Sequence, residues 1–99
     1  MDTTQLHGST VADLRNQIDE VDALLVGLIS RRRALAMGLG EAKRTENIPL
    51  DDPAREAWVV RRAAEHTRTL GHDLTDVEDV RSIFWRLIQM SRRTQQRGG

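Results

Sequence analysis

Basic side chains stand in the first part of the chain at positions where a helical pattern calls for aliphatic ones. The stretch LLVGLISRRRALAMGLG, residues 24–40, puts Arg32 into a stripe of leucines. A guanidinium there must either extend out to solvent or meet an anion in a partly dehydrated site. Lys43 follows Arg32 on the same predicted helix, about 20° around its axis and roughly 16 Å along it. Both cations therefore point to the same side and could reach a common anionic ligand.

Arg15 lies on this predicted helix as well, but about 25 Å from Arg32 along the axis. The two guanidinium groups of one chain cannot grip the same small ligand at that separation. In an antiparallel dimer, however, Arg15 of the partner subunit could approach Arg32.

Two further groups of polar residues lie on faces that otherwise look apolar. Asp52, Arg55 and Glu56 have the spacing i, i+3, i+4, which places them on one side of the first turns of a helix. Ser91 and Gln95 continue an apolar stripe with neutral hydrogen-bonding groups. A helix cap with a surface ion pair would explain the first group, and polar fraying near the C-terminus the second. Together with the three basic residues above, they indicate a pocket for a small, doubly negative, hydroxylated molecule.

The element that carries the three basic residues is a long amphipathic helix. From Val11 to Lys43 there is no proline, and apolar residues recur at the alternating spacing of four and three that packed helices show. Those positions are Leu14, Ile18, Val21, Leu25, Leu28, Leu35, Leu39 and Ala42. A helix of about 33 residues is roughly 50 Å long, whereas a compact domain of this size has a radius of gyration of only about 13 Å. We therefore expect a homodimer in which two chains lie alongside each other and share their cores, most simply through a two-fold axis.

A second helix is predicted after a loop that contains Asn47 and Pro49. Asp52 is expected to be its N-cap and Pro53 its first helical residue. The pattern continues to about Leu70, and Gly71 is expected to stop it.

A third amphipathic helix follows. Thr75 and Glu78 have the spacing of a capping box. Its apolar face comprises Val77, Val80, Phe84 and Leu87, with Ile83 and Ile88 beside them. The predicted fold is thus all-α, with helices at about 11–43, 53–70 and 76–96. These form one domain over residues 11–96, with flexible ends at 1–10 and 97–99.

Composition excludes several classes of protein. Fifteen basic and fifteen acidic residues balance, which argues against a general polyanion binder. The chain has no cysteine and no apolar run long enough to span a membrane, so a cytoplasmic location is expected. His7, His66 and His72 lack the spacing of a metal site and are interpreted as surface residues. No metal or cofactor is expected.

Three segments taken together resemble a known family. LRNQIDEVDALLVGLISRRRALAMGLGEAK, DDPARE and SRRTQQ are similar to the all-helical class of chorismate mutases. The similarity covers about residues 11–96. It implies an intertwined dimer of three-helix chains that converts chorismate to prephenate, an intramolecular rearrangement that needs no nucleophile, general base, metal or cofactor.

The resemblance implies a role for each of the eight polar residues. Arg15 matches an arginine that reaches across the dimer, Arg32 one in the middle of the first helix, and Arg55 the arginine of a D-x-x-R-E motif. Ser91 matches a serine on the carboxylate side of the substrate.

The remaining four positions concern the substrate's oxygens. Asp52 and Glu56 match the carboxylates associated with its ring hydroxyl. Lys43 and Gln95 match the pair that contacts the ether oxygen.

Several alternatives stay open. Isochorismate pyruvate lyase uses a similar scaffold, and so do mutases for 4-amino-4-deoxychorismate, whose ammonium the two carboxylates could accept as readily as a hydroxyl. A nucleic-acid binder using Arg31–Arg33 and Arg92–Arg93 is disfavoured by the zero net charge. A catalytically silent helical partner protein would share the same pattern.

Overall fold

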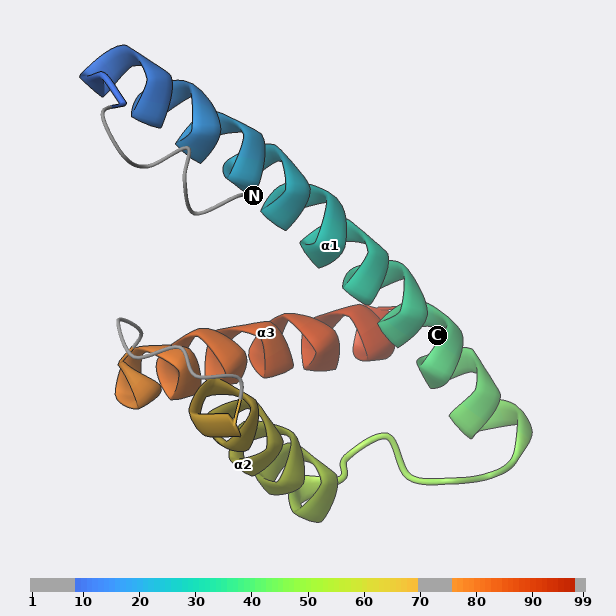
Figure 1. Ribbon diagram of the computed structural model, residues 1–99. Coiled ribbons are helices and arrows are strands. Elements are labelled where there is room, and N and C mark those ends of the chain that lie inside the picture. Colours follow the sequence, from blue (N-terminus) through green and yellow to red (C-terminus); the bar gives the residue numbers. More distant parts are fainter. Residues whose placement is uncertain (1–8, 70–75, 98–99) are drawn as a thin grey trace. The chain divides into compact units, whose positions relative to one another are not determined.

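The computed structural model describes residues 9–69 and 76–97, and this part of the chain consists of three helices without strands (Figure 1). They are α1 (Val11–Thr45), α2 (Pro53–Thr69) and α3 (Val77–Arg97). The all-α architecture expected from the sequence is confirmed. The chain divides into two compact units, Met1–Arg32 and Arg33–Gly99, so the boundary falls within α1. Within the described ranges, no helix is both long and apolar enough to cross a membrane.

The first unit contains the beginning of α1, which is capped by a reciprocal pair of side chains. The amide of Asp13 donates to Thr10 Oγ1 at 3.1 Å, and the amide of Thr10 donates to Asp13 Oδ2 at 3.3 Å. This arrangement satisfies backbone donors that an α-helix leaves unpaired in its first turn. It fixes the start of α1 at Val11, where the sequence placed it, although the cap itself was not foreseen.

In the second unit, α1 ends two residues later than predicted, at Thr45. Asn47 has a φ of 58°, the left-handed conformation that asparagine tolerates better than most residues. The amide of Ile48 then donates to the carbonyl of Lys43 at 2.8 Å, as in a Schellman-type helix end. This turn follows the end of α1 and leads the chain towards the start of α2.

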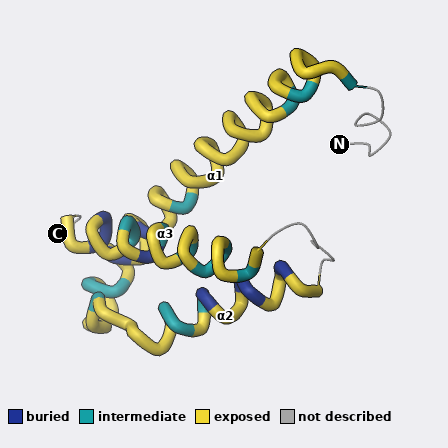
Figure 2. Tube along the Cα trace, turned by 90° about the vertical axis from the view of Figure 1, so that its left-hand side faces the viewer, coloured by how far each residue is buried: buried dark blue, intermediate teal, exposed yellow. Residues whose placement is uncertain are grey.

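The core of the second unit lies where α2 and α3 pack against each other. The buried residues on α2 are Val60, Ala63, Ala64 and Thr67, and those on α3 are Ile88, Thr94 and Gln95. Figure 2 shows the buried positions of these two helices in dark blue. The buried side chains of α2 are small, which lets the helix backbones approach closely. The buried hydroxyl of Thr67 is satisfied by the carbonyl of Ala63 at 3.0 Å.

The buried residues of α1 differ from its leucine stripe. Ala36 and Gly40 are buried, while Leu25, Leu28 and Leu35 are 50%, 61% and 65% exposed. The stripe that follows the alternating spacing of four and three is therefore not the surface that α1 buries within its own chain.

The start of α3 corrects one prediction. The amide of Glu78 donates to Asp76 Oδ1 at 2.7 Å, so Asp76 caps the helix and Val77 is its first residue. The side chain of Glu78 pairs with Arg81 instead of completing a capping box. Thr75, which the sequence analysis named as the cap, lies outside the described residues, as do Gly71, His7 and His72. Threonine and aspartate are both good caps, and the spacing of Thr75 and Glu78 did not point to Asp76.

Two further predictions concern residues near the ends of α3 and α2. Arg97, assigned to a flexible tail, is the last residue of α3. His66 is exposed at the end of α2, as expected.

The cap at Asp76 predicts a stability difference between two exposed aspartates on the same helix. Asp76→Ala should lower the free energy of unfolding by about 1 kcal/mol, since it removes the acceptor for the amide of Glu78. Asp79→Ala removes the same charge from the same helix turn but no cap, and should cost clearly less. Thermal unfolding followed by circular dichroism measures both, and equal losses would show that Asp76 is not the cap.

Candidate active site

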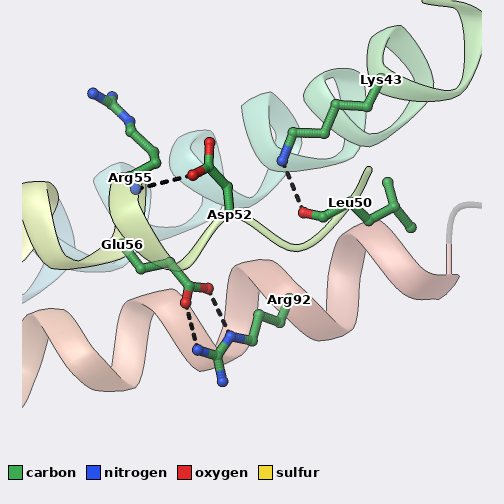
Figure 3. A network of polar contacts seen from close by, with 6 residues as sticks. All are labelled: Lys43, Leu50, Asp52, Arg55, Glu56 and Arg92. Atoms are coloured by element: carbon green, nitrogen blue, oxygen red, sulfur yellow. Dashed lines mark hydrogen bonds and ion pairs between the residues drawn. The ribbon is translucent and has the colours of Figure 1, made fainter. Parts of the chain in front are cut away.

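Lys43 and Gln95, 52 positions apart in the sequence, meet in the second unit. Lys43 Nζ donates to Gln95 Oε1 at 3.0 Å and to the carbonyl of Leu50, also at 3.0 Å. Figure 3 shows the lysine side chain extending towards the Leu50 carbonyl in the segment between α1 and α2. An ammonium has three N–H donors, and these two contacts use two of them. The amide oxygen of Gln95 accepts from the lysine, and the NH2 group of the same amide is a pure donor.

The meeting depends on a close approach of α1 to α3 at Gly40. A Cβ atom on Gly40 would lie 3.1 Å from Gln95 Cα and 3.2 Å from its Cβ and Cγ atoms. Such distances are tighter than ordinary van der Waals contact, so glycine is the residue that fits here without displacing a neighbour. Gly40 lies one helical turn before Lys43, so its contact with α3 places the lysine beside Gln95.

Arg44 strengthens the same junction and was not identified from the sequence. Its guanidinium donates through Nη2 to the backbone carbonyl of Gln95. A cation at a carbonyl near the C-terminal end of a helix is favourable, because that end carries partial negative charge. Only its place beside Lys43 in the last turn of α1 could have indicated this role.

Glu56 is held by a second arginine that sequence reasoning did not assign to the site. Arg92 Nε donates to Glu56 Oε2 at 2.6 Å, and Arg92 Nη2 donates to Oε1, so the guanidinium and carboxylate form a two-pronged pair (Figure 3). The Glu56 side chain is 16% exposed and that of Arg92 is 47% exposed. The hydrogen bond from Arg92 lowers the pKa of Glu56 below its ordinary value of 4.5, against the opposing effect of burial. Glu56 is therefore ionised at neutral pH.

This pairing has a defined pH dependence. A carboxylate whose pKa is lowered in the folded chain contributes stability that is fully present above about pH 4.5, the ordinary value. That contribution is lost as the pH falls through the lowered pKa of Glu56. The pair is intact throughout the neutral range.

Asp52 and Arg55 have contacts of a different kind. Asp52 Oδ1 accepts from the amide of Arg55 at 3.0 Å and caps α2, as predicted. The guanidinium of Arg55 lies over the ring of Trp58, 4.4 Å from its centroid. Figure 3 shows Asp52 turned towards the backbone of Arg55 while Glu56 points to Arg92. The three residues that share one helical face in the sequence therefore have three different partners.

The other predicted residues are distributed over both units. Ser91 is half-buried on α3 and donates to the carbonyl of Leu87 at 3.1 Å. Arg15, which is exposed, and Arg32, which is half-buried, belong to the part of α1 in the first unit. Six of the eight predicted residues thus belong to the second unit, where direct contact joins Lys43 to Gln95.

The charges of the second unit suit a small anion better than a metal ion. Arg92 and Lys43 supply positive charge that acts on the carboxylate of Glu56, and Gln95 adds a neutral donor beside Lys43. Within residues 9–69 and 76–97, no group of three or more acidic or histidine side chains could hold a metal ion. Donors of this kind can fix carboxylates and stabilise negative charge on an oxygen atom.

The comparison with protein families identifies one family. The chain matches the family of type II chorismate mutases over residues 14–96. It is 38% identical over 52 residues to a chorismate mutase from Methanocaldococcus jannaschii, covering 52% of each chain. It is 36% identical over 67 residues to a T-protein from Enterobacter agglomerans, covering 68% of this chain and 18% of that one. No solved structure matches.

A third relative bears a different name. A 3-dehydroquinate dehydratase from Pyrobaculum aerophilum is 30% identical over 88 residues, covering 89% of this chain and 25% of that protein. The chain thus spans about half the length of the first relative and a quarter or less of the other two.

Three helices, no strand in the described part of the chain, and a cationic site completed by a glutamine define an all-α protein suited to a small anionic ligand. The chain belongs to the type II chorismate mutase family, whose match extends from the first leucine of the α1 stripe almost to the end of α3.

The close approach at Gly40 can be tested against a second glycine of the same helix. Gly38→Ala meets no atom within 4 Å and should be neutral or stabilise the chain, by up to about 1 kcal/mol, because alanine favours helix. Gly40→Ala should instead be less stable than Gly38→Ala by about 1–2 kcal/mol, since its Cβ presses on Gln95. Chemical denaturation measures the difference, and equal stabilities would argue against the α1–α3 contact.

Proposed function

We propose that this chain catalyses the rearrangement of chorismate to prephenate. The observation that carries the proposal is the contact between Lys43 and Gln95, which joins the ends of α1 and α3. In the rearrangement the ether C–O bond breaks while a new C–C bond forms within the same molecule. Negative charge develops on the ether oxygen, so preorganised donors aimed at that oxygen lower the barrier.

The geometry of the pair supports this role. The third N–H of Lys43 and the NH2 group of Gln95 are the donors that would bind the ether oxygen. Gln95 is 9% exposed, so its amide is held in a largely dehydrated position where hydrogen bonds are strong. The hydrogen bond between the two side chains holds both in place before the substrate arrives, which reduces the cost of reorganisation.

The remaining predicted residues would fix the substrate. Arg32 and Arg55, with Arg15 of the partner subunit, would bind the two carboxylates through their planar forks. Ser91 would contact a carboxylate as well, while Asp52 and Glu56 would accept a hydrogen bond from the ring hydroxyl. These roles follow from the family resemblance and from the residue types.

We infer that the active form is a homodimer in a cytoplasmic location. The stripe of leucines on α1 supports the dimer, because Leu25, Leu28 and Leu35 are at least half exposed in the single chain. The buried hydrophobic residues among those described are Ala36, Val60, Ala63, Ala64 and Ile88, none of them a large side chain that is fully buried. So small a core favours completion by a second copy of the chain.

The proposed activity and the role of Gln95 can be tested together. The purified chain should convert chorismate to prephenate, as followed by loss of chorismate absorbance with identification of the product. In Gln95→Glu, activity should remain only at acidic pH and fall on the alkaline side, because an ionised carboxylate repels the developing charge on the ether oxygen. Gln96→Glu, at the exposed neighbouring position, should keep the wild-type profile. A flat profile for Gln95→Glu would contradict the assignment to the ether oxygen.

Sharing of a site between two subunits predicts complementation. Arg15→Ala and Lys43→Ala should each lose roughly a hundredfold or more in kcat, as expected for removal of a preorganised charged donor. When the two variants are unfolded together and refolded, half of the dimers are mixed, and each has one site with both groups intact. Activity should then recover to about a quarter of the wild-type value. If the refolded mixture recovered no activity, Arg15 and Lys43 would not serve one active site from two different subunits.

A further inference from the structure

The pair between Arg92 and Glu56 bears on which group the site accepts on the substrate's ring. Arg92 lies on α3 directly after Ser91, and its guanidinium reaches the first turn of α2 to bind both carboxylate oxygens of Glu56. A carboxylate has about four lone-pair positions. Arg92 occupies one on each oxygen, which leaves Glu56 able to accept further hydrogen bonds while its charge is compensated.

The charges around Glu56 are balanced by this arginine. The groups that act on it are Arg92 of α3 and Lys43 of α1, both cationic, and the carboxylate of Asp52. With Glu56 itself, these are two cations and two anions. A neutral hydroxyl can enter such surroundings without charge penalty, whereas an ammonium would add an uncompensated positive charge beside Arg92.

The hydrogen-bonding requirements differ in the same direction. A hydroxyl donates through its single O–H group and needs one acceptor, whereas an ammonium has three N–H donors. Arg92 has already taken part of the capacity of Glu56, and Asp52 uses Oδ1 to cap α2 through the amide of Arg55. A hydroxyl needs only one of the acceptor positions that remain on these carboxylates, whereas an ammonium needs three of them in suitable directions.

We propose that Arg92 is a positioning residue that makes the site prefer a substrate with a neutral ring hydroxyl over one with an ammonium at that position. The proposal rests on the function proposed above and narrows its substrate class. Arg92 acts through Glu56: it fixes the direction of the carboxylate and offsets its charge. Without it, Glu56 and Asp52 face Lys43 alone, and the excess negative charge suits an ammonium.

A purely structural role for the pair must be separated from this one. The pair joins α2 to α3, so its loss could reduce activity towards every substrate by loosening the fold. The ratio of kcat/KM for chorismate to that for 4-amino-4-deoxychorismate is insensitive to such a common loss. A change in this ratio therefore reports on the charge that faces the ring substituent.

The test compares Arg92→Gln with Arg93→Gln, which removes the same charge from the exposed neighbouring position. Wild type should prefer chorismate, and Arg92→Gln should lower the ratio of the two kcat/KM values about tenfold. Arg93→Gln should leave the ratio at its wild-type value. Arg92→Lys keeps the charge without the fork and should retain most of the preference, provided that circular dichroism shows each variant folded.

The pH dependence gives a second readout. Since the hydrogen bond from Arg92 is the main cause of the lowered pKa of Glu56, Arg92→Gln should move the acidic limb of kcat/KM for chorismate to higher pH. Arg93→Gln should not move it.

Several results would overturn the inference. An equal loss towards both substrates in Arg92→Gln, with the ratio and the acidic limb unchanged, would assign Arg92 to structure alone and leave the proposed function standing. If Arg93→Gln changed the ratio equally, the substrate preference would arise from net charge and not from the pair of Arg92 and Glu56. A wild-type chain that favours the amino substrate would contradict the inference directly, and one inactive towards both compounds would remove the proposed function as well.

Discussion

The close approach of α1 to α3 at Gly40 is the constraint on which the candidate site depends. Gly40 leaves only enough room for the backbone and side chain of Gln95, and the next turn of α1 then places Lys43 beside the glutamine amide. Arg44 holds the same end of α3 through the carbonyl of Gln95. A lysine and a glutamine from the ends of two helices thereby become one preorganised group of donors, and preorganisation is what an electrostatically assisted rearrangement requires.

The second feature of the site is that its carboxylates are paired with protein groups. Glu56 is paired with Arg92, and Asp52 caps α2, so each carboxylate has a defined protein partner. Paired in this way, the carboxylates can accept from a hydroxyl while the unit as a whole retains positive groups for an anionic ligand. Such a balance explains how acidic residues can belong to a site proposed to bind a dicarboxylate.

The long helix has two surfaces with different uses. Ala36 and Gly40 are small and are buried within the chain, whereas the leucine stripe is exposed. Small residues permit close packing of helix on helix, and the large ones offer apolar area to another surface. The proposed homodimer would use the stripe for association and would bring Arg15 of the partner subunit to Arg32, which one chain cannot do along a single helix.

The three helices, the cap at Asp52, the family and the chemical types at the eight candidate positions could all be recognised in the sequence. Periodicity and capping act over three to seven residues, so they can be recognised locally. Tertiary structure decided which faces meet: the choice of Gly40 for the approach to α3, the contact of Lys43 with Gln95 and the pairing of Glu56 with Arg92. These partners lie 36 to 55 positions apart, and a helical pattern shows which residues share a face but not which face lies opposite.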